Sequence, residues 1–223
     1  MDHEDIKCCT LFCGISDDDI GTLLGCINHR RCLFRKGAVI IPESLSADSF
    51  GIVLSGAVTI VKEDIRGSRT AIAVLGRNEL FGETSASCRT ESRTLTYTAS
   101  EDSVILFVGL GSLLHTCPRS CRCHRQLSEN LIRMLTDKNR MLMEKLEITS
   151  KRTLREKILA YLSSAAERSG RDYFEIPLGR VALAEYLCAD RSALTRELNN
   201  MRSDGLIDFD KNTFRIISNG ITD

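Results

Sequence analysis

The sequence predicts an α+β fold in three parts: an antiparallel β-barrel or sandwich, a long single helix, and a small winged helix-turn-helix unit. Three patterns support this prediction. Short β-branched runs separated by glycine fill residues 33–108, a stretch without Gly or Pro spans 125–148, and signals for helix, turn, helix and hairpin follow one another near the end. We therefore expect three domains, at residues 1–116, 117–149 and 150–223.

Composition excludes several classes of protein. The 223 residues are 43% hydrophobic and 27% charged, which is enough apolar material for a core and argues against a disordered or fibrous chain. The first residues lack a signal-peptide pattern, and the longest apolar run, 104–114, is shorter than the roughly 20 residues of a membrane span. We expect a cytoplasmic protein. Nucleophile-elbow, P-loop, H-E-x-x-H and C-x-x-C patterns are missing, so we do not expect an enzyme.

The net charge does not decide whether the partner is a nucleic acid. Thirty basic side chains balance 30 acidic ones, which gives a formal net charge of zero. The acidic excess lies within residues 1–110, however, and the later part of the chain is mildly basic. A few well-placed Arg side chains can support DNA binding without a large overall positive charge.

The first part of the chain predicts a short helix and then several strands. Ser16 precedes an acidic turn and an apolar segment, which is the pattern of a helix N-cap. Many short strands with frequent turn signals are typical of an antiparallel barrel or sandwich. The predicted strands are 38–41, 50–54, 57–61, 70–75, 95–99 and 104–108.

An apolar stripe runs along the stretch 125–148, which would form a helix of about 24 residues and about 36 Å. Its leucines recur at intervals of four or seven residues, as in a coiled coil. Such a helix between two domains is typical of one that pairs with its own copy about a two-fold axis. The alternative is packing along the chain's own β domain. The predicted dimerisation residues are Leu127, Leu131, Leu135, Leu142 and Leu146.

The last part of the chain predicts a winged helix-turn-helix, a motif that binds double-stranded DNA. The second helix of this motif enters a major groove, and its first turns reach the base edges. The predicted elements are a helix at 154–169, a strand at 173–176, helices at 181–187 and 191–203 around the turn 188–190, and a hairpin around Lys211 and Asn212.

Four side chains of the second helix are candidate DNA contacts. Asp190 is a good N-cap, and Arg191, Ser192, Thr195 and Arg196 follow it on one face of the helix. Arg is the side chain best suited to bind guanine O6 and N7 with two hydrogen bonds. The alternative is a solvated charged face on a regulatory module that binds a ligand but not DNA.

Two segments resemble the Crp/Fnr family of bacterial transcription regulators. One is Leu183 to Leu198 followed by Asp204-Gly-Leu-Ile, and the other is Leu80-Phe-Gly-Glu-Thr-Ser with Arg93-Thr94 further on. The resemblance covers essentially the whole chain. It implies a cyclic-nucleotide-binding-type β-roll, a homodimer that binds a pseudo-palindromic operator, and RNA polymerase as a partner. By the same likeness Arg191, Ser192 and Arg196 read bases and Arg180 contacts a phosphate.

The resemblance also implies an effector pocket. Gly82 would let backbone N–H groups approach an anion, Glu83 would accept a ribose hydroxyl, and Arg93 would neutralise a phosphate. In the alternative, Glu83 and Arg93 pair with each other. Hydroxyl side chains contact the adenine in the cyclic-AMP receptor, but Leu142 and Met143 stand there, so cyclic AMP is not the expected effector. A small anionic or nucleotide-like effector fits better. The predicted pocket residues are Phe81, Gly82, Glu83, Thr84, Arg93, Thr94, Leu142 and Met143.

Ten cysteines are a second candidate sensor, because in a cytoplasmic chain they indicate reduced thiols, metal or redox chemistry. One cluster is Cys8, Cys9 and Cys13. The spacing C-x2-C, which is the strongest zinc signal, does not occur, so no metal site is assigned. A thiol or metal redox-sensing regulator, including an iron–sulfur one, is the alternative function. We expect Cys26, Cys32 and Cys188 to be buried as small apolar residues. The candidate ligands of the second cluster are Cys117, Cys121, Cys123 and His124.

Overall fold

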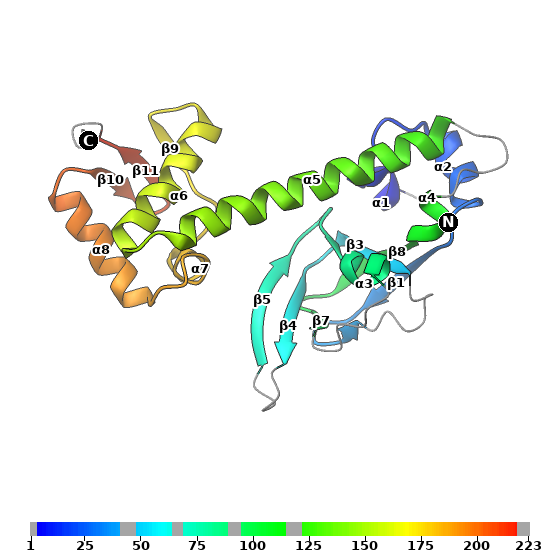
Figure 1. Ribbon diagram of the computed structural model, residues 1–223, viewed down its shortest axis with the longest axis horizontal. Coiled ribbons are helices and arrows are strands. Elements are labelled where there is room, and N and C mark those ends of the chain that lie inside the picture. Colours follow the sequence, from blue (N-terminus) through cyan, green and yellow to red (C-terminus); the bar gives the residue numbers. More distant parts are fainter. Residues whose placement is uncertain (1–3, 41–47, 64–68, 89–94, 115–121, 218–223) are drawn as a thin grey trace. The chain divides into compact units, whose positions relative to one another are not determined.

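The computed structural model describes residues 4–40, 48–63, 69–88, 95–114 and 122–217 (Figure 1). The chain forms two compact units, 1–137 and 138–223. The long helix α5 (Arg122–Ser150) begins in the first unit and ends in the second. The α+β fold predicted from the sequence is confirmed, with strands before the long helix and a helix-turn-helix after it.

The N-terminal unit contains two four-stranded antiparallel sheets. The strand order is β1-β8-β3-β6 in the first sheet and β2-β7-β4-β5 in the second. Each predicted strand is present, and β1 and β6 were not predicted. The bounds in the first sheet are β1 His29–Phe34, β3 Ser49–Ser55, β6 Leu80–Phe81 and β8 Ser103–Gly109, and in the second sheet β2 Val39–Ile40, β4 Val58–Glu63, β5 Arg69–Leu75 and β7 Leu95–Ala99.

The first sheet is covered on both faces. One face packs against the second sheet through residues such as Val53 and Phe107, and the other packs against helices through residues such as Phe50 and Leu106. The alternation of side chains along a strand produces these two cores. The covering helices are α1 (Glu4–Lys7), the 3-10 helix η1 (Thr10–Phe12), α2 (Asp17–Leu24), α4 (Leu110–Leu114) and the first half of α5, and α3 (Glu83–Cys88) follows β6.

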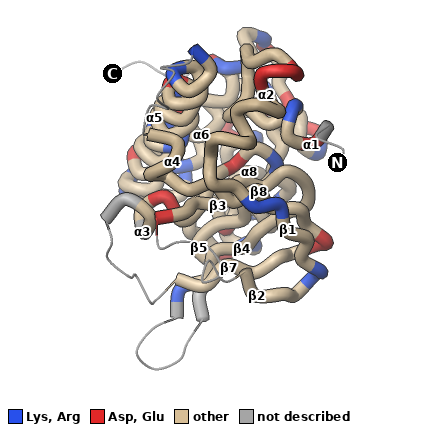
Figure 2. The backbone as a smooth tube through the Cα atoms, turned by 90° about the vertical axis from the view of Figure 1, so that its right-hand side faces the viewer, with Lys and Arg blue, Asp and Glu red and all other residues tan. Residues whose placement is uncertain are grey.

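Helix α2 begins as the sequence predicts. The Ser16 side chain accepts a hydrogen bond from the Asp19 backbone N–H. The acidic residues of its first turn complement the positive end of the helix dipole. Figure 2 shows these acidic residues on α2 and a further acidic start on α3.

The C-terminal unit is a winged helix-turn-helix. Thr153 and Glu156 form a reciprocal capping box at the start of its first helix, and Gly170 ends that helix with a φ of 62°. The predicted helices, strand and hairpin are confirmed within two residues at each end. The elements are α6 (Leu154–Ser169), β9 (Tyr173–Glu175), α7 (Arg180–Tyr186), α8 (Arg191–Ser203), β10 (Ile207–Asp210) and β11 (Thr213–Ile216), with the strands in the order β10-β11-β9.

Candidate nucleic-acid interface and effector region

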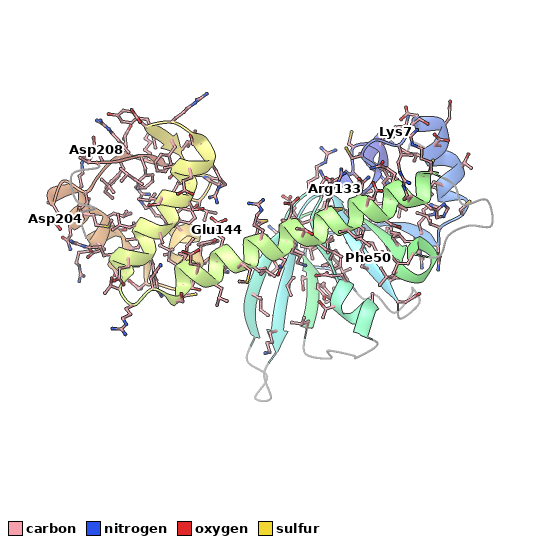
Figure 3. The ribbon with its side chains drawn as sticks, turned by 45° about the horizontal axis from the view of Figure 1, so that its top comes forward. Lys7, Phe50, Arg133, Glu144, Asp204 and Asp208 are labelled. Atoms are coloured by element: carbon pink, nitrogen blue, oxygen red, sulfur yellow. The ribbon has the colours of Figure 1, made fainter. Side chains whose placement is uncertain are left out.

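Helix α8 is held by the core beneath it and by ion pairs at its side. Leu194 and Leu198 are 0% and 1% exposed and pack in the core of the C-terminal unit. Arg155 on α6 donates a hydrogen bond to Glu197 at 2.6 Å. Arg155 also forms an ion pair at 2.7 Å with Asp204, which follows the last residue of α8 and is labelled in Figure 3. The opposite face of α8 is therefore presented in a fixed orientation.

The first turn of α8 is ordered by its N-cap. The Asp190 carboxylate accepts hydrogen bonds from the backbone N–H groups of Ser192 (2.8 Å) and Ala193 (3.1 Å), and from the Ser192 hydroxyl (2.5 Å). These bonds, that of the Ser192 side chain foremost, lower the pKa of Asp190. The carboxylate is therefore charged at neutral pH, and it stabilises α8 through its attraction to the positive N-terminal end of the helix dipole.

The exposed face of α8 carries the four predicted DNA contacts together. Their side chains line one shallow hollow, with Asn199 as a fifth member. We call these residues the recognition face: Arg191, Ser192, Thr195, Arg196 and Asn199. Asn199 was not predicted, although its spacing of eight residues from Arg191 places it on the same side of a helix. The face combines two guanidinium groups with two hydroxyls and one amide, which suits hydrogen bonding to base edges.

Arg180, the first residue of α7, contacts the hairpin of β10 and β11. Its Nη2 donates to the backbone oxygen of Lys211 at 2.7 Å, and the guanidinium lies 5.1 Å from the ring centroids of both Phe209 and Phe214. Burial lowers the pKa of Arg180, and its Nη1 is buried without a hydrogen-bond partner among the described residues. The Arg180 side chain is thus directed toward the hairpin, and its contact with a phosphate stays a prediction.

The end of α5 is tied to α6 and α7 within the C-terminal unit. Glu144, labelled in Figure 3, accepts hydrogen bonds from Ser164 and Arg168 on α6. Burial raises the pKa of Glu144, but these hydrogen bonds lower it by more, so that the net shift is downward. Lys145 lies 5.3 Å from the ring centroid of Tyr186 on α7. These contacts fix the last turns of α5 to α6 and α7.

The predicted effector pocket is only partly described. Arg93 and Thr94 lie outside the described residues. Leu142 and Met143 are 58% and 59% exposed on α5, in the C-terminal unit. Residues 81–84 run from β6 into α3, with Thr84 exposed.

Phe81 belongs to the core of the N-terminal unit rather than to an open pocket. It is 1% exposed, and its ring centroid lies 4.8 Å from that of Tyr97 and 6.2 Å from that of Phe107. A Cβ atom at Gly51 would lie 2.4 Å from Phe81 Cζ, so the ring requires glycine there. We correct the assignment of Phe81 to the ligand contacts, because its ring is needed between the two sheets.

Gly82 has the backbone freedom that the sequence predicts, with a φ of 78°. Its backbone already forms a hydrogen bond with Tyr97. Burial, and then the charge of Glu83, raise the pKa of Tyr97, while that hydrogen bond lowers it. The sequence did not predict the contact between Tyr97 and Gly82, because the residues around Gly82 do not indicate which residue of β7 lies against them.

Two of the predicted dimerisation residues lie in the chain's own core. Leu127 and Leu131 are 0% and 3% exposed and pack with the helices and the first sheet of the N-terminal unit. This is a correction, because a side chain buried there cannot contact a second copy. Leu135, Leu142 and Leu146 are 37%, 58% and 61% exposed. The first half of α5 thus follows the alternative, packing along its own domain.

The cysteines differ from the prediction in their burial. Cys26 and Cys188 are exposed and Cys32 is half-buried, so the expectation that all three are buried is wrong. Cys188 occupies the left-handed turn before α8, with a φ of 52°, where its side chain points to solvent. Among the cysteines whose burial is described, Cys9 is the buried one, and burial raises the pKa of its thiol to about 11.

No group of three metal-ligating side chains occurs within the described parts of the chain. In the first cluster, Cys8 and Cys13 are exposed whereas Cys9 is buried. In the second, Cys117 and Cys121 lie outside the described residues. Helix α5 starts earlier than predicted, so half-buried Cys123 and buried His124 lie in its first turn rather than before it.

Two family models match the chain. Residues 31–120 match the cyclic nucleotide-binding domain, and residues 156–219 match the Crp-like helix-turn-helix domain. Together they cover more than half of the chain, on the two sides of α5. The chain belongs to the Crp/Fnr family. As a Crp/Fnr regulator it joins an effector-binding domain to a DNA-binding domain. The comparison with curated proteins found no match to its sequence.

Solved structures of Crp/Fnr fold resemble this regulator at low sequence identity. CprK in complex with OCPA has a TM-score of 0.67 and 17% identity, over 91% of this chain and 90% of that one. A CooA mutant from Carboxydothermus hydrogenoformans gives 0.59 and 17%, over 89% and 86%. The c-di-GMP-responsive regulator CLP of Xanthomonas campestris gives 0.54 and 18%, over 91% and 100%. None of the helices within the described residues is long and apolar enough to cross a membrane.

Proposed function

We infer that this Crp/Fnr regulator is a homodimer that binds a pseudo-palindromic DNA operator under the control of a small effector. The proposed domains are 1–116 for the effector, 117–149 for dimerisation and 150–223 for DNA. The recognition face of α8 is the observation that carries the proposal, because five hydrogen-bonding side chains are exposed together on a helix whose other face is buried in the core. RNA polymerase is the proposed protein partner.

The exposed side of α5 supports the homodimer. Ile132 is 62% exposed, and it is followed at intervals of three, seven and four residues by the exposed Leu135, Leu142 and Leu146. Such intervals place the side chains on one stripe of a helix, which adjoins the positions of the buried Leu127 and Leu131. Pairing of two copies through this stripe would bring two recognition helices to successive major grooves, about 34 Å apart.

The effector is proposed to be a small anionic or nucleotide-like molecule other than cyclic AMP. CprK and CLP are described with different ligands, OCPA and c-di-GMP, on a similar fold. The apolar side chains of Leu142 and Met143 cannot donate hydrogen bonds to an adenine. Effector binding would favour one packing of the two α5 helices, and so one separation of the recognition faces.

Replacing both arginines of the recognition face tests DNA binding. We expect Arg191→Ala with Arg196→Ala to weaken binding to an operator selected from a random duplex library by at least about 30-fold, since each bidentate Arg–guanine pair contributes about 1–3 kcal/mol. Fluorescence anisotropy measures the affinity, and thermal unfolding checks the fold. The control, Lys151→Ala with Arg171→Ala, removes the same charge from exposed positions of the same unit. Equal losses for both pairs would contradict base reading.

Charges on the apolar stripe test the homodimer. We expect Leu142→Glu with Leu146→Glu to convert a dimer to a monomer in sedimentation velocity. Met141→Glu is the matched control, because Met141 is 56% exposed but lies about 100° around the helix from Leu142. A wild-type chain that sediments as a monomer, or a control that dissociates as the double variant does, would contradict this interface.

Anaerobic purification tests the effector. Metal analysis and mass spectrometry of the co-purifying material should reveal an organic anion, and added ligand should change operator affinity. An iron–sulfur absorption spectrum would instead favour the redox-sensing alternative. A DNA affinity that responds to no ligand, metal or redox condition would contradict effector control.

A further inference from the structure

The 3-10 helix η1 (Thr10–Phe12) is a single turn that packs in the core of the N-terminal unit. Leu11 and Phe12 are 0% and 1% exposed, and they share this core with residues of the first half of α5. Figure 1 shows the flanking helices α1 and α2 around the start of α5. A turn this short leaves the N–H and carbonyl groups at its ends to be satisfied by other segments.

The N-terminal end of η1 is capped from a distant part of the chain. The backbone N–H of Thr10 donates to Oδ1 of Asn78 at 3.2 Å, across 68 positions of the sequence. Asn78 adopts a φ of 66°, which asparagine tolerates better than most residues. Its own backbone N–H donates to the carbonyl of Val53 at 2.8 Å. The backbone that carries this cap is therefore anchored on β3.

The cap belongs to the segment that leads into Gly82. We call residues 76–82 the β6 segment, because they comprise the turn before β6, the strand itself and Gly82. Successive side chains of a strand point to opposite faces. Leu80 accordingly belongs to the core that contains η1 and α5, and Phe81 to the core between the two sheets. Because both are at most 3% exposed in close-packed cores, a shift of Phe81 would also displace Leu80 on the η1 side.

The C-terminal end of η1 is bound by α5. Nδ2 of Asn130 donates to the carbonyls of Leu11 (2.9 Å) and Cys13 (2.7 Å). Nε2 of Gln126, one turn earlier on α5, donates to Oδ1 of Asn130 at 3.1 Å, which sets the orientation of the Asn130 amide. Asn130 is 3% exposed, so a movement of α5 away from η1 would leave two carbonyls without their donor.

The turn η1 is thus held by one asparagine from the β6 segment and one from α5. We propose that η1 couples the β6 segment to the first half of α5, and that Asn78 and Asn130 are the positioning residues of this connection. An effector that moved the Gly82 region would thereby change the packing of α5, the helix of the proposed dimer contact. The inference rests on the proposed effector control, and it gives the N-terminal segment a regulatory role.

Methyl NMR of the full-length chain tests the connection in the folded state. Asn78→Gly removes the cap but permits the positive φ, and we expect it to shift the methyl signals of Leu127 and Leu131 on α5. Asn78→Asp keeps an acceptor at the same position and should leave these signals at their wild-type positions. Arg77→Ala is the matched control, because it removes an exposed side chain from the adjacent position.

The reverse change should report from the other side of η1. Asn130→Ala is expected to shift the methyl signals of Leu80 in β6, since coupling between two sites is reciprocal. Shifts confined to Leu11 in both variants would overturn the proposal, because η1 would then absorb each change locally. Equal shifts on α5 in Arg77→Ala and Asn78→Gly would overturn it as well.

A double-mutant cycle on unfolding of the N-terminal unit gives a second measure. Because Asn78→Gly and Asn130→Ala release the same turn, we expect the double variant to raise the unfolding constant at least about 3-fold less than the product of the single effects. The control pair is Asn78→Gly with Asn139→Ala, at an exposed position of the same helix, where the effects should multiply within about 2-fold. Multiplicative effects in both pairs would contradict the connection.

Operator affinity separates failure of this inference from failure of the proposed function. Asn78→Gly should weaken binding to the selected operator about 5-fold or more, because looser packing of α5 disfavours the proposed pairing, and Asn78→Asp should bind as the wild type does. Unchanged affinity in a variant whose α5 signals have shifted would overturn the regulatory role of η1. If the wild-type chain binds no operator, the proposed function fails, and the methyl signals and the cycle still decide whether η1 connects β6 to α5.

Discussion

The recognition face and the region around Gly82 are built in opposite ways. The recognition face comes from nine consecutive positions of one helix, with its side chains in solvent and its support in a core below. The Gly82 region comes from strands far apart in the sequence, and Phe81, Tyr97 and Phe107 fill its interior. A substitution on the first should change binding with little effect on stability. A substitution in the second should change stability as well.

The largest effect is expected beneath the recognition face. Leu194→Ala should reduce the free energy of unfolding of the C-terminal unit by about 2–5 kcal/mol, because Leu194 is fully buried and its loss leaves a cavity. Denaturant unfolding followed by circular dichroism measures this change. The adjacent Thr195→Ala should stay within about 0.5 kcal/mol of wild type while weakening operator binding. Similar instability of both variants would remove the distinction between face and core.

A smaller loss is expected inside the β-roll. Gly51→Ala should destabilise the N-terminal unit by about 1–3 kcal/mol, since the new Cβ would lie 2.4 Å from Phe81 Cζ. Gly21→Ala is the matched control, because Gly21 is in α2 with nothing within 4 Å of its Cβ position. That change should be neutral or stabilising in the same unfolding measurement. A Gly51→Ala variant as stable as wild type would show that the rings can move.

Next in size is the polar contact between α5 and the N-terminal segment. Asn130 is 3% exposed, and its Nδ2 donates to the carbonyls of Leu11 (2.9 Å) and Cys13 (2.7 Å). Asn130→Ala should cost about 1.5 kcal/mol in thermal unfolding, because both carbonyls lose their partner. Asn139→Ala, at an exposed position of the same helix, should cost less than about 0.5 kcal/mol. Equal costs would indicate that the two buried carbonyls find other donors.

The smallest effect concerns acid. The pKa of Asp190 is lowered in the folded chain, so its capping contribution is present above about pH 4, near its unfolded value, and is lost as pH falls through the folded pKa. Asp190→Asn keeps a capping side chain without the titration. The difference in melting temperature between wild type and this variant should therefore shrink between pH 6 and about pH 3. A constant difference would contradict the linkage.

The sequence predicted the recognition face because a helix brings residues together by spacing alone. It predicted most strands for the same local reason, but not β1, where Arg30 and Arg31 hide the pattern of an edge strand. Spacing could not tell that the first part of the apolar stripe of α5 packs on the chain's own domain, so Leu127 and Leu131 were wrongly assigned to the dimer contact. Contacts of Arg180 and Tyr97 depend on strand pairing over long sequence distances, which local patterns do not contain.

The N-terminal helices have a practical consequence for solubility. Ile6, Leu11 and Phe12 are at most 2% exposed, and they cover the face of the first sheet that includes Phe50 and Leu106. A fragment that began at residue 31, where the family model starts, would leave this apolar sheet face uncovered. Exposed apolar patches of this kind promote aggregation. A recombinant effector domain should therefore retain the N-terminal helices.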